Sequence, residues 1–349
     1  MRKSVWALCF MAFVLATSMG CGGGGGGGGG TSAYSQADLS GDWGCHVLGA
    51  NPTGSVWGHG IYSIDASGKG VVTTETWSDS SHFDNNITLT LSGGGVMSEG
   101  VTSLHGFMSV DKNTVVATYS NGAGGNSLWL LQRVGTTTFS QADLSGDWGF
   151  HVLGGTPTGF GSSWGHGIYS IDNTGKGVVT TQTWSDNTPQ LDNTTFTLSI
   201  AGVMGSGVDN TQHGFMSIDK NTVVATFTND AGGSSFWILQ RRVGTTFLPA
   251  DLTGTWGCHL LGLTPTQSAW GYGEYSIDNT GKGVVVITPP QASSDFTLVF
   301  FPTTFTLSDA GEMSTIGDNH GFMSVDKNTM VATFTNIGLG SSFWLLQKR

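Results

Sequence analysis

The hydrophobic and polar positions of this chain form short runs of β-prone residues that are separated by turn residues. The pattern is clearest in residues 139–246, where no stretch keeps a helical hydrophobic period over three turns. Connections between the runs are short enough for hairpins, so neighbouring strands should be antiparallel. The pattern predicts eight short strands, at 149–153, 167–171, 177–184, 194–200, 202–205, 214–218, 222–228 and 235–241.

The same arrangement of residues occurs three times along the chain. The sequence LSGDWGCH at residue 39 returns as LSGDWGFH at residue 144 and as LTGTWGCH at residue 252. Each copy ends in a similar strand, with the sequences LWLLQR, FWILQR and FWLLQK. Such self-similarity is typical of tandem modules. We therefore expect three β modules, at 39–138, 139–246 and 247–349.

A weaker repeat inside each module leaves two main architectures open. In the second module, HGIYSID at residue 166 is echoed by HGFMSID at residue 213. Each module could close into an eight-stranded up-and-down barrel, which has no free edges, or six four-stranded units could form one β-propeller. The units are spaced unevenly, in pairs, which independent modules explain better. We expect an all-β fold of three tandem antiparallel modules that form small barrels, with a six-bladed propeller or sandwiches as alternatives.

Composition agrees with this fold class and excludes some partners. Gly accounts for 56 of 349 residues and charged residues for 11%, which suits short strands that are joined by tight turns. The formal net charge is −11. An acidic chain argues against nucleic acid and against anionic membrane surfaces as partners.

The N-terminal segment has the layout of a secretory signal peptide. Arg2 and Lys3 precede an apolar run at 5–16, which is too short to span a bilayer. The sequence SMGC, ending at Cys21, resembles a lipobox, in which the cysteine is lipidated. Nine glycines follow at 22–30 and form a flexible tether. We expect a signal peptide at 1–20 and a lipidated tether at 21–38, which would anchor an exported lipoprotein to the cell envelope or outer membrane.

The two ends of each module resemble those of the calycin group, which includes lipocalins, fatty-acid-binding proteins and avidins. A Gly-x-Trp sequence lies on the first strand, and a basic residue lies near the end of the last strand. The resemblance implies barrels in which the tryptophan closes one end and the basic residue packs across it. That role would fall to the pairs Trp43 with Arg133, Trp148 with Arg241, and Trp256 with Lys348.

Recurring aromatic and histidine residues are the candidates for a binding surface. Exposed Trp and Tyr side chains could stack on sugar rings or line a pocket for a small apolar molecule. The positions that match between modules are Trp57, His59 and Trp77 in the first, Trp164, His166 and Trp184 in the second, and Trp270 and Tyr272 in the third. We expect a ligand of unknown identity, a glycan or a small apolar molecule, to bind there.

Three histidines of the first module, His46, His59 and His105, raise the alternative of a zinc site. Two of them precede Gly at the start of a strand, where an imidazole can simply satisfy hydrogen bonds of the rim. Asp65, Asp172 and Asp278 begin D-x-x-G-K-G stretches, which indicate Asx-capped turns. We therefore expect structural histidines and turn aspartates, with no metal and no cofactor.

Common catalytic motifs are missing from the sequence, among them H-E-x-x-H and the P-loop. We expect a non-enzymatic, envelope-anchored lipoprotein whose repeated modules form a binding or adhesive array. A structural spacer without a ligand and a carrier of small apolar molecules are the alternatives. An array needs matching exposed aromatic residues, and a carrier needs an unfilled barrel interior.

Overall fold

The computed structural model describes residues 34–349, apart from 80, 84–85, 101–103, 121–124, 188–192, 208–210, 243, 287–291, 294–301, 316–318 and 337–339. The expected signal peptide, Cys21 and the glycine tether lie outside the described residues. Among the described residues, the regular elements are antiparallel strands and three short 3-10 helices, η1 (Gln36–Leu39), η2 (Gln141–Leu144) and η3 (Pro249–Leu252).

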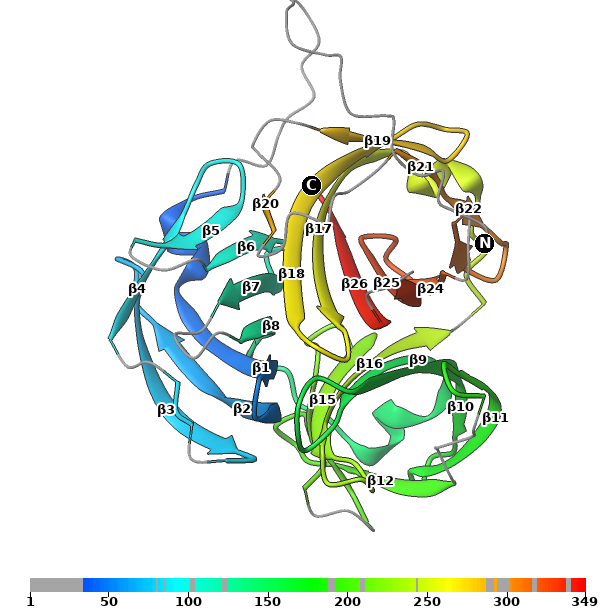
Figure 1. The fold of residues 1–349 in the computed structure, drawn as a ribbon, viewed down its shortest axis with the longest axis horizontal. Helices are drawn as coiled ribbons and strands as arrows, with labels where there is room; N and C mark the ends of the chain where they lie inside the picture. The colour runs from blue at the N-terminus through cyan, green and yellow to red at the C-terminus, as the bar shows by residue number, and fades with distance from the viewer. Residues whose placement is uncertain are drawn as a thin grey trace, which may run out of the picture. The chain divides into compact units, whose positions relative to one another are not determined.

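The first module is a closed barrel of eight strands, which Figure 1 draws in blue to cyan. Each strand pairs with its neighbour in sequence, and the last strand returns to pair with the first. Its strands are β1 (Gly41–Asn51), β2 (Gly54–Ile64), β3 (Lys69–Trp77), β4 (Ile87–Leu91), β5 (Val96–Glu99), β6 (His105–Met108), β7 (Thr114–Ser120) and β8 (Asn126–Arg133).

The second module closes in the same way and is drawn in green in Figure 1. Its strands are β9 (Gly146–Gly155), β10 (Ser162–Ile171), β11 (Lys176–Trp184), β12 (Thr194–Leu198), β13 (Val203–Ser206), β14 (His213–Met216), β15 (Thr222–Thr228) and β16 (Ser234–Arg242). All eight predicted runs correspond to strands of this barrel.

The third module is a sheet whose two end strands are separated by Phe305 alone, so it curls round like the other two. Its strands are β17 (Gly254–Leu263), β18 (Ser268–Ile277), β19 (Lys282–Val286), β20 (Ala292–Ser293), β21 (Thr303–Thr304), β22 (Thr306–Leu307), β23 (Glu312–Ser314), β24 (His320–Met323), β25 (Thr329–Asn336) and β26 (Gly340–Lys348). We call the three modules barrels 1, 2 and 3.

The expected fold of tandem all-β barrels is confirmed, and the six-bladed propeller is wrong. The two halves of each module that echo one another are not separate blades. In barrel 2, β11 pairs with β12, and β16 pairs with β9, so the halves join along both sides of one closed sheet. Closure satisfies the strand edges that separate four-stranded blades would leave open.

The D-x-x-G-K-G turns form as predicted, through the aspartate side chain. Asp172 Oδ1 accepts hydrogen bonds from the backbone N–H groups of Thr174 at 2.8 Å and Lys176 at 3.1 Å. Gly175 has a φ of +89°, a backbone conformation that residues other than Gly rarely adopt. The turn between β10 and β11 recurs in the other two barrels because their sequences repeat the D-x-x-G-K-G stretch.

One end of each barrel is closed by a buried tryptophan with a basic side chain over it. The Trp148 indole N–H donates to the Leu144 carbonyl at 2.7 Å, which joins η2 to β9. The Arg241 guanidinium lies 4.3 Å from the Trp148 ring centroid and donates to the carbonyls of Ser145, Asp143 and Lys220. Barrel 1 repeats these contacts with Trp43 and Arg133, and barrel 3 places Lys348 5.5 Å from the Trp256 ring centroid.

A fourth apolar core lies between the barrels, in addition to the core inside each of them. The first strand of each barrel is buried on both faces, since one face lines its own barrel and the other packs against a neighbour. The shared core contains Leu48, Val116, Leu128 and Leu130 of barrel 1, Leu153, Val224, Phe236 and Ile238 of barrel 2, and Leu261, Val331, Phe343 and Leu345 of barrel 3.

The contacts between barrels are cyclic: the first two strands of each barrel pack against the last two strands of another barrel. Strands β1 and β2 contact β15 and β16, β9 and β10 contact β25 and β26, and β17 and β18 contact β7 and β8. The C-terminal Arg349 lies over the Phe107 ring of barrel 1, 4.3 Å from its centroid, and pairs with Glu274. Each barrel thus offers one face to the next barrel and a different face to the previous one.

Replacing Arg241 tests how much the barrel closure contributes to stability. We expect Arg241→Met to lower the free energy of unfolding by about 3 kcal/mol, because several charge-assisted hydrogen bonds to backbone carbonyls are lost. Arg241→Lys should cost less, since Lys348 keeps a contact to the Asp251 carbonyl at 3.1 Å in barrel 3. Urea denaturation measures both, and equal costs below about 1 kcal/mol would contradict this role.

Candidate functional site

The predicted surface residues Trp57 and His59 lie in the interface between barrels 1 and 2. Their rings stack, with centroids 5.6 Å apart and an angle of 8° between the planes. His59 stacks in turn on His213 of barrel 2, with centroids 3.6 Å apart and an angle of 2°. The Trp57 indole N–H donates to Thr228 Oγ1 of barrel 2 at 2.9 Å. Trp57 is only 4% exposed, so this group is an interface and not a free surface.

The other two interfaces repeat the same stack of three rings. Trp164 stacks on His166, which stacks on His320 at 3.7 Å, and Trp270 stacks on Tyr272, which stacks on His105 at 3.3 Å. The expectation of an exposed aromatic surface therefore needs correction at Trp57, His59, Trp164, His166, Trp270 and Tyr272. The physical reason is that apolar outer faces of the barrels must be covered, and neighbouring barrels cover them.

A more deeply buried histidine accompanies each stack. His46 is fully buried, and its Nδ1 lies 3.1 Å from Thr226 Oγ1 of barrel 2. Burial, together with the neighbouring His213 and His59, holds the pKa of His46 well below its ordinary value. Burial also lowers the pKa of His59 to about 3 and that of His213 to about 4. The imidazoles of the interface are therefore neutral at neutral pH.

The three histidines that were considered for zinc do not meet. His46 and His59 face barrel 2, whereas His105 packs against His259 and Tyr272 of barrel 3. Within the described part of the chain, no group of three or more His, Cys, Asp or Glu side chains is arranged to hold a metal ion.

Trp77 and Trp184 occupy equivalent positions at the ends of β3 and β11, away from the interfaces. In barrel 1, Phe83 fills the interior beside Trp77, with ring centroids 4.6 Å apart, and is 3% exposed. In barrel 2, Phe150 occupies the position that Cys45 has in barrel 1, and its ring packs against Tyr169 and Trp237 inside the barrel. No aromatic ring among the described residues packs on Trp184.

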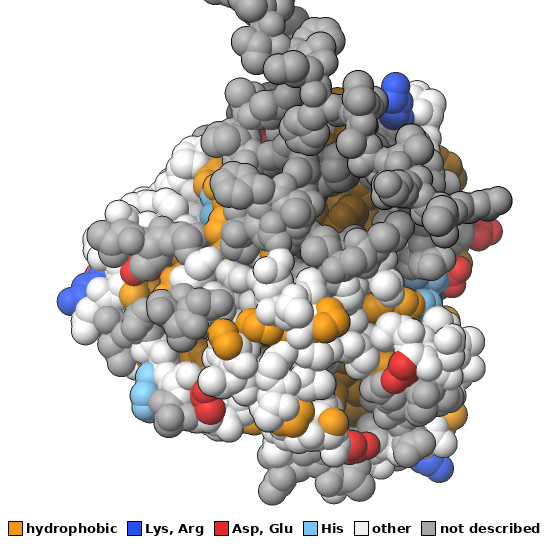
Figure 2. Space-filling model, in the orientation of Figure 1, with side chains coloured by type: hydrophobic (Ala, Val, Ile, Leu, Met, Phe, Trp, Pro, Cys, Tyr) orange, Lys and Arg blue, Asp and Glu red, His pale blue; other side chains and the backbone are white. Residues whose placement is uncertain are grey.

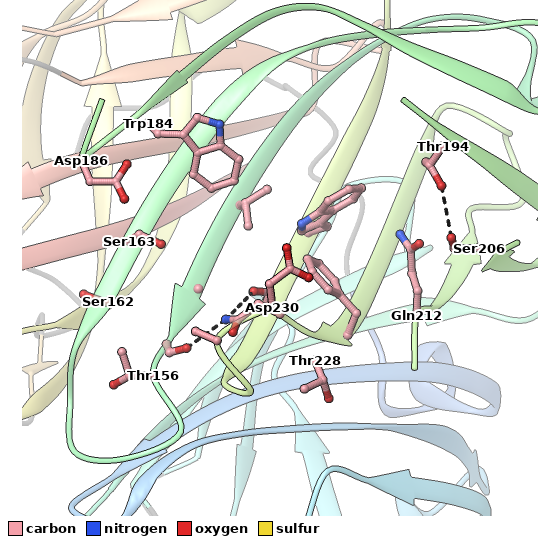
Figure 3. A pocket seen from close by; sticks show the side chains of 18 of the residues that line it. Thr156, Ser162, Ser163, Trp184, Asp186, Thr194, Ser206, Gln212, Thr228 and Asp230 are labelled. Carbon is pink, nitrogen blue, oxygen red and sulfur yellow. Dashed lines mark hydrogen bonds between the residues drawn. The ribbon is translucent and has the colours of Figure 1, made fainter. Parts of the chain in front are cut away.

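Barrel 2 has a cavity of about 690 Å³ at the end opposite Trp148 and Arg241. Tyr169, Trp184, Phe227 and Trp237 supply its aromatic walls. Figure 3 shows Trp184 and Asp186 on one side, Thr194, Ser206 and Gln212 on the other, and Asp230 between them. The volume lies within the range of small-molecule sites, and polar groups ring an aromatic interior, as such sites require.

The polar groups of this cavity differ in whether they already have partners. Asn229 donates to the Gly155 carbonyl at 3.0 Å, and Thr194 lies 3.3 Å from Ser206 Oγ. Trp237 Nε1 and Gln212 Nε2 are buried atoms without a hydrogen-bond partner among the described residues. An unpaired buried donor is costly, so both atoms call for an acceptor that the described residues do not supply.

Charge restricts what the cavity can accept. Its described lining includes the carboxylates of Asp186 and Asp230 and no Lys, Arg or His. Anionic ligands are disfavoured by such a lining, whereas neutral or positively charged ones are tolerated.

The sequence predicted Trp184 but missed Trp237, Gln212 and Asp230 as parts of one site. The repeat did contain a signal, because the second module differs from the first at Phe150 and lacks an aromatic residue in the segment that follows Trp184. Phe150 packs on Tyr169 in barrel 2 as Phe83 packs on Tyr62 in barrel 1, but the ring beside Trp77 has no counterpart beside Trp184 among the described residues.

Comparison with protein-family models and with curated proteins finds no match. Similar solved structures include a protein of unknown function from the DUF3598 family of Nostoc punctiforme, with 13% identity and a TM-score of 0.22, covering 60% of this chain and 99% of that one. Transferrin binding protein B from serogroup B Neisseria meningitidis is 10% identical, with a TM-score of 0.29 and coverages of 84% and 63%. A double mutant of transferrin binding protein B from Haemophilus parasuis is 8% identical, with a TM-score of 0.22, and the match covers 88% of this chain and 75% of that one. Similarity this low supports no argument about function.

The buried imidazoles predict that acid weakens the fold. The unfolded chain binds protons below pH about 6.5, whereas the pKa values of His59, His105 and His166 are about 3 in the folded chain. These histidines therefore leave the free energy of unfolding at its full value above pH 6.5. Below pH 6.5 they lower it progressively, until the pH reaches about 3. At pH 5.5 each such histidine should cost about 1.4 kcal/mol.

Urea denaturation between pH 7.5 and 5 measures this loss. A His59→Tyr variant copies the natural Tyr272–His105 stack and removes one titrating group, so its stability should fall less steeply with acid. A wild-type free energy of unfolding that stays constant from pH 7 to pH 5 would be incompatible with neutral, buried histidines.

Proposed function

We propose that this chain is a non-catalytic binding protein of the bacterial cell envelope, and that the open end of barrel 2 holds a small neutral or positively charged ligand. The observation that carries the proposal is the cavity of about 690 Å³, whose wall contains the buried Trp237 indole N–H, a donor without a partner among the described residues. A folded protein rarely leaves such a donor unpaired unless water or a ligand meets it.

The cavity favours one ligand site over an array of equal sites. An array needs matching exposed aromatic residues, but Trp57, Trp164 and Trp270 are each less than 8% exposed. In barrel 1 the interior beside Trp77 is filled by Phe83. A spacer would have no use for an unfilled interior, so the carrier alternative fits best, with a more polar ligand than we expected from the sequence.

Several observations support a role without catalysis and without nucleic acid. The described lining of the cavity contains no His, Cys or Lys, and its two carboxylates, Asp186 and Asp230, are both exposed. On the face drawn in Figure 2, Lys and Arg side chains are isolated and form no basic patch. The net charge of −11 also argues against nucleic acid as a partner.

The proposed location rests on the N-terminal sequence. Arg2, Lys3 and the apolar run at 5–16 would direct export, and Cys21 would carry the lipid that anchors the protein to the membrane. Within the described part of the chain, no helix is long and apolar enough to cross a membrane.

Native mass spectrometry of residues 31–349, purified from an envelope extract without detergent, tests the proposal. We expect one extra mass per chain, and Trp237→Phe should reduce its retention about tenfold, because the ring stays and the N–H donor is lost. Trp129→Phe, at the equivalent position of barrel 1, is the matched control. Bare protein mass, or equal losses in both variants, would contradict a ligand site in barrel 2.

A further inference from the structure

Trp184 lines the cavity of barrel 2 and is 5% exposed, so only part of its ring borders the cavity. One face of the ring lies on the backbone of Gly165, where an added Cβ would come within 2.6 Å of ring atoms. Its indole N–H donates to Gln182 Oε1 at 2.6 Å. The ring is therefore held flat and in one orientation before any ligand arrives, which lowers the entropic cost of stacking on it.

Barrel 1 shows what covers the other face of the equivalent tryptophan when the barrel fills itself. Trp77 lies on Gly58 in the same way, and Phe83 covers its other face. The Phe83 backbone N–H donates to Glu75 Oε2 at 2.8 Å, and this hydrogen bond holds Phe83 in its position inside the barrel. In barrel 2, Phe150 packs on Tyr169 and beside Gly167, as Phe83 packs on Tyr62 and beside Gly60 in barrel 1. No aromatic ring among the described residues packs on Trp184, however.

The hydrogen-bonding groups decide which kind of ring fits barrel 2. Trp237 and Gln212 offer donors that have no partner within the described part of the chain, and the exposed Asp230 carboxylate is an acceptor in the lining. Because Asp230 is exposed, its carboxylate is hydrated, whereas an organic cation or a hydrocarbon would leave both buried donors unpaired. An anion would meet the carboxylates of Asp186 and Asp230.

From this we infer that the cavity of barrel 2 binds a neutral saccharide, with the apolar face of one sugar ring stacked on Trp184. Sugar hydroxyls both accept and donate, so they can pair with the Trp237 and Gln212 donors and with the Asp230 carboxylate, while the C–H face of the ring packs on Trp184. This inference rests on the proposed function and adds the ligand class.

Isothermal titration of residues 31–349 with a panel of neutral mono-, di- and trisaccharides tests the inference, with benzyltrimethylammonium and laurate as cationic and anionic probes. We expect one saccharide per chain, no binding of laurate, and at least tenfold weaker binding by Trp184→Ala. Trp184→Phe should recover part of the affinity because it keeps a flat ring.

Trp77→Ala is the matched control, since Phe83 covers Trp77 in barrel 1, and it should leave saccharide affinity unchanged. Circular dichroism establishes that each variant is folded before it is titrated. Should the Ala variant of Trp184 unfold, the comparison of Trp184→Phe with Trp77→Phe decides the same point.

The outcomes separate the two proposals. Binding of the cation alone, weakened by changes at Trp184, would overturn the saccharide inference and leave a ligand site in barrel 2. Saccharide binding that is insensitive to Trp184 would also overturn the inference. If no probe binds and the protein from the envelope extract has its bare mass, both proposals fail.

Discussion

The structure depends on covering the apolar outer faces of three small barrels. In an up-and-down barrel the outward residues usually face water, but here the outward faces of β1, β9 and β17 are buried and, apart from one histidine on each strand, largely apolar. Burial of apolar area contributes about 25 cal/mol per Å², so these faces favour strongly any arrangement that removes them from water. The three barrels achieve this by packing around one shared core.

The interface histidines follow from the same constraint. Each interface joins two barrels, so its stacked rings come from different modules and could not be grouped from positions within one module. His59, for example, stacks on His213 of the next barrel and not on another histidine of its own. Once buried there, the imidazoles stay neutral, and polar atoms such as His46 Nε2 lack a partner among the described residues. These interfaces combine tight packing with sensitivity to acid.

Covering the outer faces leaves the barrel ends as the places where modules can differ. The closed end is constrained by contacts such as those of Trp148 with Leu144 and Arg241. The opposite end is less constrained, and there barrel 1 inserts Phe83 while barrel 2 keeps a cavity. A repeat of similar modules can thus gain one specific site without a change of fold.

The sequence predicted the strands, turns and Trp–Arg pairs because each depends on local spacing. Period-two patterns and Asx turns act within a few residues, so all eight runs of the second module correspond to strands. The interfaces depend on pairing between modules, which no local pattern encodes. A hint existed in residues 45–50, where the apolar run hardly alternates, as in strands that are buried on both faces. The cavity escaped prediction because its lining comes from several strands and loops that meet only in the folded barrel and not from one motif.

Calorimetric unfolding of residues 31–349 tests the central claim, which is that the shared core makes the three barrels one cooperative unit. The account predicts a single transition at neutral pH whose calorimetric enthalpy equals its van't Hoff enthalpy. It also predicts that Phe236→Ala, which truncates a shared-core residue outside the barrel interior, shifts the whole transition to lower temperature. Separate transitions for individual barrels, with one of them alone shifted by Phe236→Ala, would contradict it.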